Sequence, residues 1–244
     1  MKKLRNESRL AGAHNLIANC GEAVPGETLL LCYEPSSLNY YDQSIVDDVH
    51  KQALEIGLSV TLCELGFDPY IARLPPGLDQ AMDDADVTIF LARAADQMRF
   101  SSFKADKRTI ISYALTGDSL ASPFGSVEYE AMLRLKTVID AVVFSAELLE
   151  ISCSAGTLFS GSAQVSPEGG DANLRRFPML VNTPAPAKNF SGCCALPGFL
   201  VGTGSKYYAP YGVTFDSPLL VHFKGNKLLY FEGATADEKK ANDH

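Results

Sequence analysis

The sequence has none of the short motifs by which many enzymes are identified. No Gly-x-Gly-x-x-Gly follows the first expected strand, where the turn reads Glu34-Pro35-Ser36-Ser37, so the usual dinucleotide fingerprint is missing. No Walker loop, His-Glu-x-x-His or Gly-x-Ser-x-Gly occurs either. A nucleotide-dependent enzyme is therefore disfavoured, because only a general likeness of fold would support it.

Histidine, the commonest ligand of catalytic zinc and non-haem iron, is also scarce. The chain has four His, whereas a catalytic zinc or non-haem iron usually needs at least two imidazoles that converge with other ligands. These His lie far apart in the sequence, so an ordinary surface or strand His is the favoured interpretation for each. His222 is the least improbable ligand, because it alternates with Val221 and Phe223 in an expected strand that could flank a cleft. The residues alone predict no metal site.

The six Cys form no recognisable disulfide or zinc pattern. No Cys-x-x-Cys is present, and the adjacent Cys193 and Cys194 suit neither a metal knuckle nor an easy disulfide. Two small residues in a Gly-rich loop are the favoured interpretation of this pair. A redox pair is the alternative, but no basic neighbour is present that would activate a thiol.

A net positive charge and long apolar runs are lacking as well. The formal net charge of −8 argues against nucleic acid and against an anionic membrane surface as main partners. No uninterrupted apolar run of about 18 residues exists, so no membrane span is expected. No apolar core of signal-peptide length follows the N-terminal charges. The expectation is a soluble, cytoplasmic, globular protein.

The clearest positive signal is a β-α-β unit over residues 25–65. An apolar strand, Leu29–Tyr33, is followed by a polar turn, an amphipathic helix over residues 42–56 and a second apolar strand. Asp42 is the candidate N-cap of this helix, and Gly57 is expected to end it. The near-absence of polar residues in the first strand is typical of a parallel sheet covered by helices on both faces.

The same alternation continues along the first half of the chain. Two further strands are expected at residues 86–91 and 108–113, with helical patterns between them and a long one over residues 126–147. We therefore predict an α/β fold with a doubly wound, mostly parallel sheet of four strands in an open-sheet domain over residues 1–150.

The second half has a different composition. It is dense in Gly, Ser, Pro and Asn, and Lys224-Gly225-Asn226 predicts a hairpin over residues 219–231. We expect a β-rich second domain over residues 151–244, which would be incomplete.

Ligands of open α/β sheets bind beyond the carboxyl ends of the strands. Ser36 follows the first expected strand, and Arg93 and Asp96 follow the third. These three are the candidate substrate-binding residues, for a small molecule or a peptide. An Arg93–Asp96 ion pair that only orders its loop is the favoured alternative. Further polar residues at this edge are Glu34, Asn39, Gln97, Thr116 and Asp118. No catalytic residue is assigned.

Several short stretches together resemble one family over nearly all of the chain. They resemble the metallo-aminopeptidases of the leucyl aminopeptidase/aminopeptidase T type and the similar 2,5-dihydroxypyridine 5,6-dioxygenases. The stretches are Val24-Pro25-Gly26-Glu27-Thr28-Leu29-Leu30-Leu31, Glu150-Ile151-Ser152-Cys153-Ser154-Ala155-Gly156-Thr157-Leu158, and Leu196-Pro197-Gly198-Phe199 followed by Tyr208-Ala209-Pro210, Gly212-Val213-Thr214-Phe215 and the 219–231 hairpin.

The resemblance implies a divalent metal, zinc or iron. The chemistry would be hydrolysis of an N-terminal peptide bond or iron-dependent opening of a dihydroxylated ring. Phe199 stands where the aminopeptidases place a metal-binding Glu, and in this respect it is closer to the dioxygenases. The other His and Asp ligands of the family lie further toward the C-terminus than residue 244. The chain is then a fragment, or it descends from a form that lost the site.

A second class of function stays open beside the enzyme. It is a non-catalytic binding or assembly protein that uses the inter-domain crevice or a homodimer face.

Overall fold

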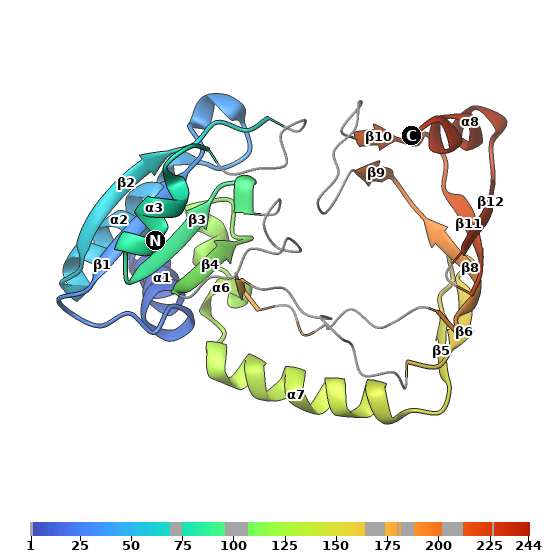
Figure 1. Cartoon of the computed structure of the whole chain (residues 1–244), viewed down its shortest axis with the longest axis horizontal. Helices are drawn as coiled ribbons and strands as arrows, with labels where there is room; N and C mark the ends of the chain where they lie inside the picture. The colour runs from blue at the N-terminus through green and yellow to red at the C-terminus, as the bar shows by residue number, and fades with distance from the viewer. Residues whose placement is uncertain are drawn as a thin grey trace. The chain divides into compact units, whose positions relative to one another are not determined.

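The computed structural model describes residues 2–68, 75–95, 107–163, 174–179, 181, 188–201, 212–225 and 227–244. The chain divides into two compact units (Figure 1). Unit 1 comprises Met1–Lys136 and Ala172–Val181, and unit 2 comprises Thr137–Asp171 and Asn182–His244. Each unit is described by itself below.

Unit 1 is built on a parallel sheet, which confirms the predicted fold class. Its strands lie in the order β2-β1-β3-β4-β7, and every neighbouring pair is parallel. The order changes direction between β1 and β3, which makes this pair the topological switch point of the sheet. The strands are β1 (Thr28–Tyr33), β2 (Ser59–Glu64), β3 (Val87–Leu91), β4 (Arg108–Ser112) and β7 (Arg175–Phe177).

Helices cover both faces of this sheet. Successive side chains of each strand point to opposite faces, so an apolar strand has apolar side chains to bury on both. Leu29 and Leu31 of β1 belong to one buried cluster, together with residues of the N-terminal helix and of the helix α2 (Gln43–Ile56). Leu30 and Cys32 belong to a second cluster with residues of α3. The elements around the sheet are α1 (Lys2–His14), η1 (Asn15–Cys20), η2 (Ser36–Leu38), α2 (Gln43–Ile56), α3 (Leu78–Asp84), α5 (Gly117–Leu120) and α6 (Pro123–Ser126).

The ends of α2 follow the signals that the sequence carries. The Asp42 carboxylate accepts a hydrogen bond from the backbone N of Ser44 at 2.7 Å, which satisfies one of the free N–H groups of the first turn. Gly57 ends the helix in the left-handed region at φ +95°. The predicted N-cap and the predicted helix stop are both confirmed, and they fix where the loop between β1 and α2 begins and ends.

Strand β7 is a correction to the expected sheet of four strands. It lies in the stretch for which the sequence predicts the second domain, yet it pairs with β4. Phe177 is 1% exposed within the first buried cluster, and Arg175 donates hydrogen bonds to the Cys20 carbonyl at 2.7 Å and the Glu22 carboxylate at 3.0 Å. A strand of three residues is too short to give a periodic signal, and its contacts to residues at the start of the chain hold it in place.

Unit 2 contains two antiparallel sheets. The larger has the order β12-β11-β8-β6-β5, and β9 pairs with β10 in the smaller. The predicted hairpin is confirmed as β11 and β12. The elements are β5 (Leu149–Ser152), β6 (Leu158–Gly161), β8 (Ser191–Leu196), β9 (Phe199–Val201), β10 (Gly212–Thr214), β11 (Leu219–Lys224), β12 (Lys227–Glu232) and α8 (Thr235–Asp243); α7 (Tyr129–Ser145) begins in unit 1 and continues into unit 2.

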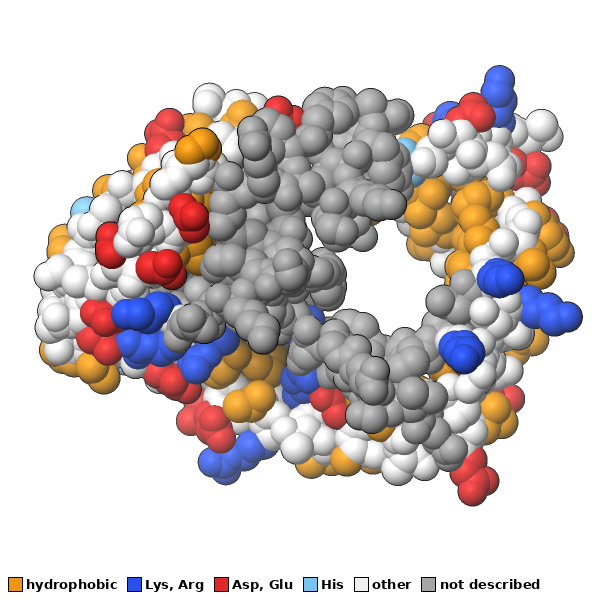
Figure 2. All heavy atoms as spheres, in the orientation of Figure 1, with side chains coloured by type: hydrophobic (Ala, Val, Ile, Leu, Met, Phe, Trp, Pro, Cys, Tyr) orange, Lys and Arg blue, Asp and Glu red, His pale blue; other side chains and the backbone are white. Residues whose placement is uncertain are grey.

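Several large apolar side chains of unit 2 are exposed. Leu158 is 67% exposed and Phe199 is 59% exposed, and Figure 2 shows a patch of hydrophobic side chains on this unit. Both large buried clusters lie in unit 1. Among the helices of the described ranges, none combines the length and the apolar character needed to cross a lipid bilayer.

Candidate functional site

The loops that follow β1, β3 and β4 meet at the carboxyl edge of the parallel sheet. The backbone N of Glu34, directly after β1, donates to the Leu91 carbonyl at the end of β3 at 3.0 Å. The Tyr41 hydroxyl donates to the Ser112 carbonyl at the end of β4 at 2.7 Å, and Tyr41 is buried. The loop between β1 and α2 is therefore tied to two other strand ends.

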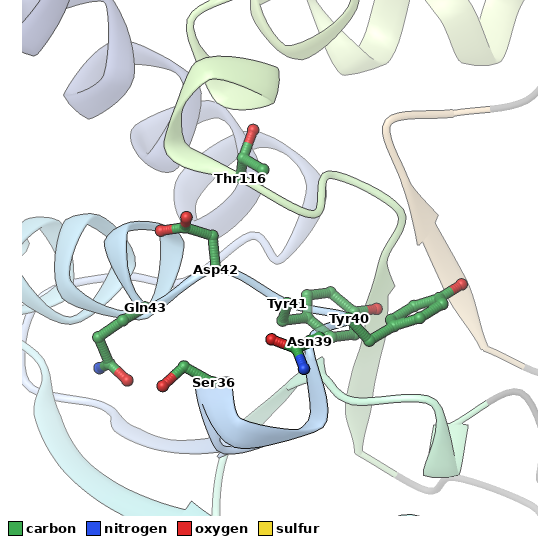
Figure 3. A pocket seen from close by; sticks show the side chains of 7 residues that line it. All are labelled: Ser36, Asn39, Tyr40, Tyr41, Asp42, Gln43 and Thr116. Carbon is green, nitrogen blue, oxygen red and sulfur yellow. The ribbon is translucent and has the colours of Figure 1, made fainter.

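A pocket of about 470 Å³ opens at this edge (Figure 3). Its size lies within the range of roughly 300–1,000 Å³ that is usual for small-molecule sites. Thr116, on the loop after β4, lies across the pocket from Ser36 in Figure 3. We call this site the edge pocket; its lining residues are Ser36, Asn39, Tyr40, Tyr41, Asp42, Gln43 and Thr116.

Some polar groups of the edge pocket are engaged within the protein. The Thr116 hydroxyl accepts from the backbone N of Ser119 at 3.1 Å, as the N-cap of α5. The Gln43 amide donates to Asp47 at 3.0 Å. Hydrogen bonds from Ser44 hold the pKa of Asp42 below its usual value, so this carboxyl is negatively charged at neutral pH.

Ser36 and Asn39 keep capacity for further hydrogen bonds. Both side chains are exposed, and the Ser36 hydroxyl has no hydrogen-bond partner in the described part of the chain. The Asn39 amide makes one long contact, 3.5 Å from the Ser37 carbonyl. Asn39 also adopts φ +52°, a backbone conformation that Asn tolerates better than most residues. The short helix η2 thus presents two polar side chains that are available to a ligand.

An ion pair between Glu34 and Arg93 lies at the switch point between β1 and β3. The Glu34 side chain is 0% exposed and the Arg93 side chain is 17% exposed. Arg93 Nε lies 3.1 and 3.0 Å from the two carboxylate oxygens, and its Nη2 lies 2.7 Å from Oε2. The backbone N of Arg93 donates to the same carboxylate. Glu34 is therefore held by both the main chain and the side chain of Arg93.

Two aromatic rings also contact Arg93. Its guanidinium carbon lies 4.4 Å from the centre of the Tyr40 ring and 3.9 Å from the centre of the Phe67 ring. Such contacts favour a cation over an aromatic face. We call Arg93, Glu34, Tyr40 and Phe67 the Arg93 cluster. Tyr40 also lines the edge pocket, so this cluster adjoins the pocket wall.

The structure thus brings two of the three sequence candidates, Ser36 and Arg93, to one edge, while Asp96 lies outside the described residues. Glu34 is the partner of Arg93, a role that the sequence did not indicate. The sequence offers one signal for this ion pair: Glu34 comes directly after an apolar, buried strand. A carboxylate that is buried there needs a partner of opposite charge. Asp118, also expected at this edge, pairs with Arg9 at 2.6 Å.

The described residues do not fit a catalytic metal centre. Within the described ranges, no three His, Cys, Asp or Glu side chains converge as a ligand set would. His222 in β11 stacks on Tyr230 with ring centres 4.2 Å apart, and its Nε2 lies 2.8 Å from the Glu232 carboxylate. Two side chains of this pair leave a metal without the remaining protein ligands that a zinc or iron site uses.

The adjacent cysteines lie in strand β8. The Cys193 thiol donates to the Gly156 carbonyl at 3.3 Å, and burial raises the pKa of Cys194. Both are free thiols. They belong to regular strand structure rather than to the loop that the sequence suggested.

No protein-family model matches the sequence, and no curated protein matches it either. Among solved structures, the chain is similar to wild-type AmpT from Thermus thermophilus, with a TM-score of 0.47 and 12% sequence identity. The match covers 98% of this chain and 74% of that one.

Proposed function

We propose that unit 1 binds a small polar molecule, or one end of a peptide, in the edge pocket. The observation that carries this proposal is the position of the pocket: it lies at the carboxyl edge of a parallel sheet, beside the switch point between β1 and β3. Open α/β sheets bind their ligands at such positions. The available polar groups of Ser36 and Asn39 would orient the ligand.

The reaction that we propose follows the family resemblance. The chain would supply the substrate-binding part of a metal-dependent aminopeptidase-like or ring-cleaving dioxygenase-like protein. Support comes from two of the resembling motifs, which occupy tight turns of unit 2. Gly156, between β5 and β6, has φ +106°, and Gly198, between β8 and β9, has φ +104°. Because the described residues do not fit a metal centre, this proposal requires ligands from elsewhere.

A non-catalytic binding or assembly protein is the second candidate. It is favoured by the same geometry, because ligand binding in the edge pocket needs no metal and uses only residues of unit 1. The two candidates predict the same ligand contacts in unit 1. They differ in whether bound ligand is turned over.

Binding is tested by titrating the ¹⁵N-labelled chain with the dipeptide leucylglycine and with 2,5-dihydroxypyridine. We expect the amide signals of residues 36–43 to shift in a saturable way with one of the two probes. The double variant Ser36→Ala/Asn39→Ala should weaken that binding, whereas Ser126→Ala, at an exposed position outside the pocket, should not. No saturable shift in residues 36–43 with either probe would refute the proposed pocket.

Turnover is tested on the full natural reading frame. Metal content is measured first, and release of leucine from leucylglycine and loss of dihydroxypyridine absorbance are then followed with added Zn²⁺ or Fe²⁺. Turnover that depends on metal supports the enzyme. Saturable binding without any turnover supports the non-catalytic candidate.

A further inference from the structure

Arg93 has donors that its buried partner does not use. An arginine side chain carries five N–H donors in one plane. Glu34 takes those on Nε and on one side of Nη2, which is the side-on arrangement of an arginine–carboxylate pair. The end-on edge of the same guanidinium, formed by Nη1 and the outer side of Nη2, is then left for a second acceptor.

This second edge is open to solvent. In the described part of the chain no hydrogen bond to Arg93 Nη1 occurs, and Nη1 is not one of the buried polar atoms that lack a partner. The Arg93 side chain is 17% exposed. Among the described residues, the guanidinium therefore combines a buried edge that Glu34 fixes with an accessible edge that no acceptor fills.

The surroundings hold the guanidinium in one orientation. The buried carboxylate of Glu34 fixes its plane through two donors, and the Tyr40 and Phe67 rings contact its central carbon. A donor pair fixed in advance loses little conformational freedom when it binds an acceptor, in contrast to a free surface arginine.

We propose that the accessible edge of Arg93 binds a carboxylate group of the ligand in the edge pocket. Two parallel N–H groups match the two oxygens of a carboxylate. Tyr40 lines the pocket and also contacts the Arg93 guanidinium, so the pocket and the guanidinium share one side chain. The inference rests on the proposed pocket and narrows its ligands to carboxylic acids.

Charge in the neighbourhood limits the strength of this contact. Glu34 neutralises Arg93, and Asp42 adds one negative charge to the pocket. The expected preference therefore comes from matched hydrogen bonds rather than from net charge. It also follows that removing the charge of Glu34 should strengthen binding of a carboxylate.

The test compares two probes that differ only in their terminal group, which is a carboxylate in N-acetyl-leucine and an uncharged amide in N-acetyl-leucinamide. Binding is followed by NMR through the Nε–Hε signal of Arg93 and through the amides of residues 36–43. We expect the acid to bind about tenfold more tightly than the amide, which corresponds to about 1.4 kcal/mol. The Arg93 Nε–Hε signal should shift with the acid alone.

Variants separate a binding role from a purely structural one. Glu34→Gln keeps the size of the side chain and an acceptor for Arg93, and it should raise the affinity for the acid several-fold without changing that for the amide. Arg93→Lys should abolish the difference between the probes. The control Arg134→Lys alters an exposed arginine of α7, whose side chain is 79% exposed, and should change neither affinity.

The outcomes distinguish the two proposals. If both probes shift residues 36–43 equally and the Arg93 signal does not move, the pocket stands and the carboxylate inference is overturned. If neither probe produces a saturable shift in residues 36–43 or in Arg93, the inference is overturned as well. An unchanged acid affinity in Glu34→Gln would also overturn it, even if Arg93→Lys does not fold.

Discussion

Replacing Arg93 alone should destabilise unit 1 strongly, because the buried charge of Glu34 depends on it. Glu34 is 0% exposed and receives donors from Nε and Nη2 of Arg93. Arg93→Met keeps a long side chain but removes both of these donors, so that only a main-chain donor remains. Breaking one side of a buried ion pair costs about 3–5 kcal/mol. We expect about 3 kcal/mol, because Arg93 itself is partly exposed.

A second substitution identifies the cause of this loss. Glu34→Gln in the Arg93→Met background removes the buried charge and keeps an acceptor for the backbone N of residue 93. We expect the double variant to recover about 2 kcal/mol, because the cost of the uncompensated charge disappears. The control Arg134→Met breaks an exposed pair with Glu130 and should change stability by less than about 0.5 kcal/mol.

Native-state hydrogen exchange of the amides of Leu29–Tyr33 is the suitable assay, because these amides belong to the parallel sheet of unit 1. A loss of about 3 kcal/mol accelerates exchange through global opening by roughly 100-fold. An acceleration below about fivefold in Arg93→Met would refute the dependence of Glu34 on Arg93. So would the absence of any recovery in the double variant.

Three further predictions concern single residues. Gly192 has φ +132°, and a Cβ there would lie 2.1 Å from a carbonyl oxygen of β6. Gly192→Ala should therefore destabilise unit 2 by at least about 2 kcal/mol, as measured by urea unfolding followed by circular dichroism. An unchanged urea midpoint would contradict this prediction. Cys153 is exposed and a threonine hydroxyl lowers its pKa, whereas burial raises the pKa of Cys20 to about 12. Mass spectrometry should therefore detect alkylation by iodoacetamide at Cys153 well before alkylation at Cys20. Equal alkylation rates at the two thiols would count against this prediction. The side chain of Lys240 lowers the pKa of Asp237, so this carboxylate stabilises unit 2 fully above about pH 4 and loses its effect as pH falls through the lowered pKa. Asp237→Asn should therefore make the urea midpoint less dependent on pH below about 4. An unaltered pH profile would refute this role of Asp237.

The sequence predicts the elements whose signals are local. The cap at Asp42, the stop at Gly57 and the turn at Gly225 each lie within a few residues of the element that they delimit. The apolar strands of unit 1 are likewise recognisable, because parallel strands buried on both faces need apolar side chains at successive positions.

Features that depend on distant residues could not be predicted in this way. Glu34 and Arg93 are 59 positions apart, and nothing in the sequence around either residue indicates the other. Strand β7 has three residues, and its place in the sheet depends on β4 and on the carbonyl of Cys20. Both are set by tertiary contacts, which a single sequence does not record.

The β-α-β unit that is clearest in the sequence provides one wall of the edge pocket, and its chemistry explains why a phosphate site is missing there. In dinucleotide-binding folds, a glycine-rich turn and the N-terminus of the following helix bind an anion together. Here the turn contains Pro35 and Ser36, and the N-terminus of α2 is already occupied by the carboxylate of Asp42. Side chains are then the remaining candidates that we consider for donors to an external anion at this edge. Within the described part of this edge, Arg93 at the end of the neighbouring strand has donors that are fixed in place and still partly unused, and we therefore assign the carboxylate to it.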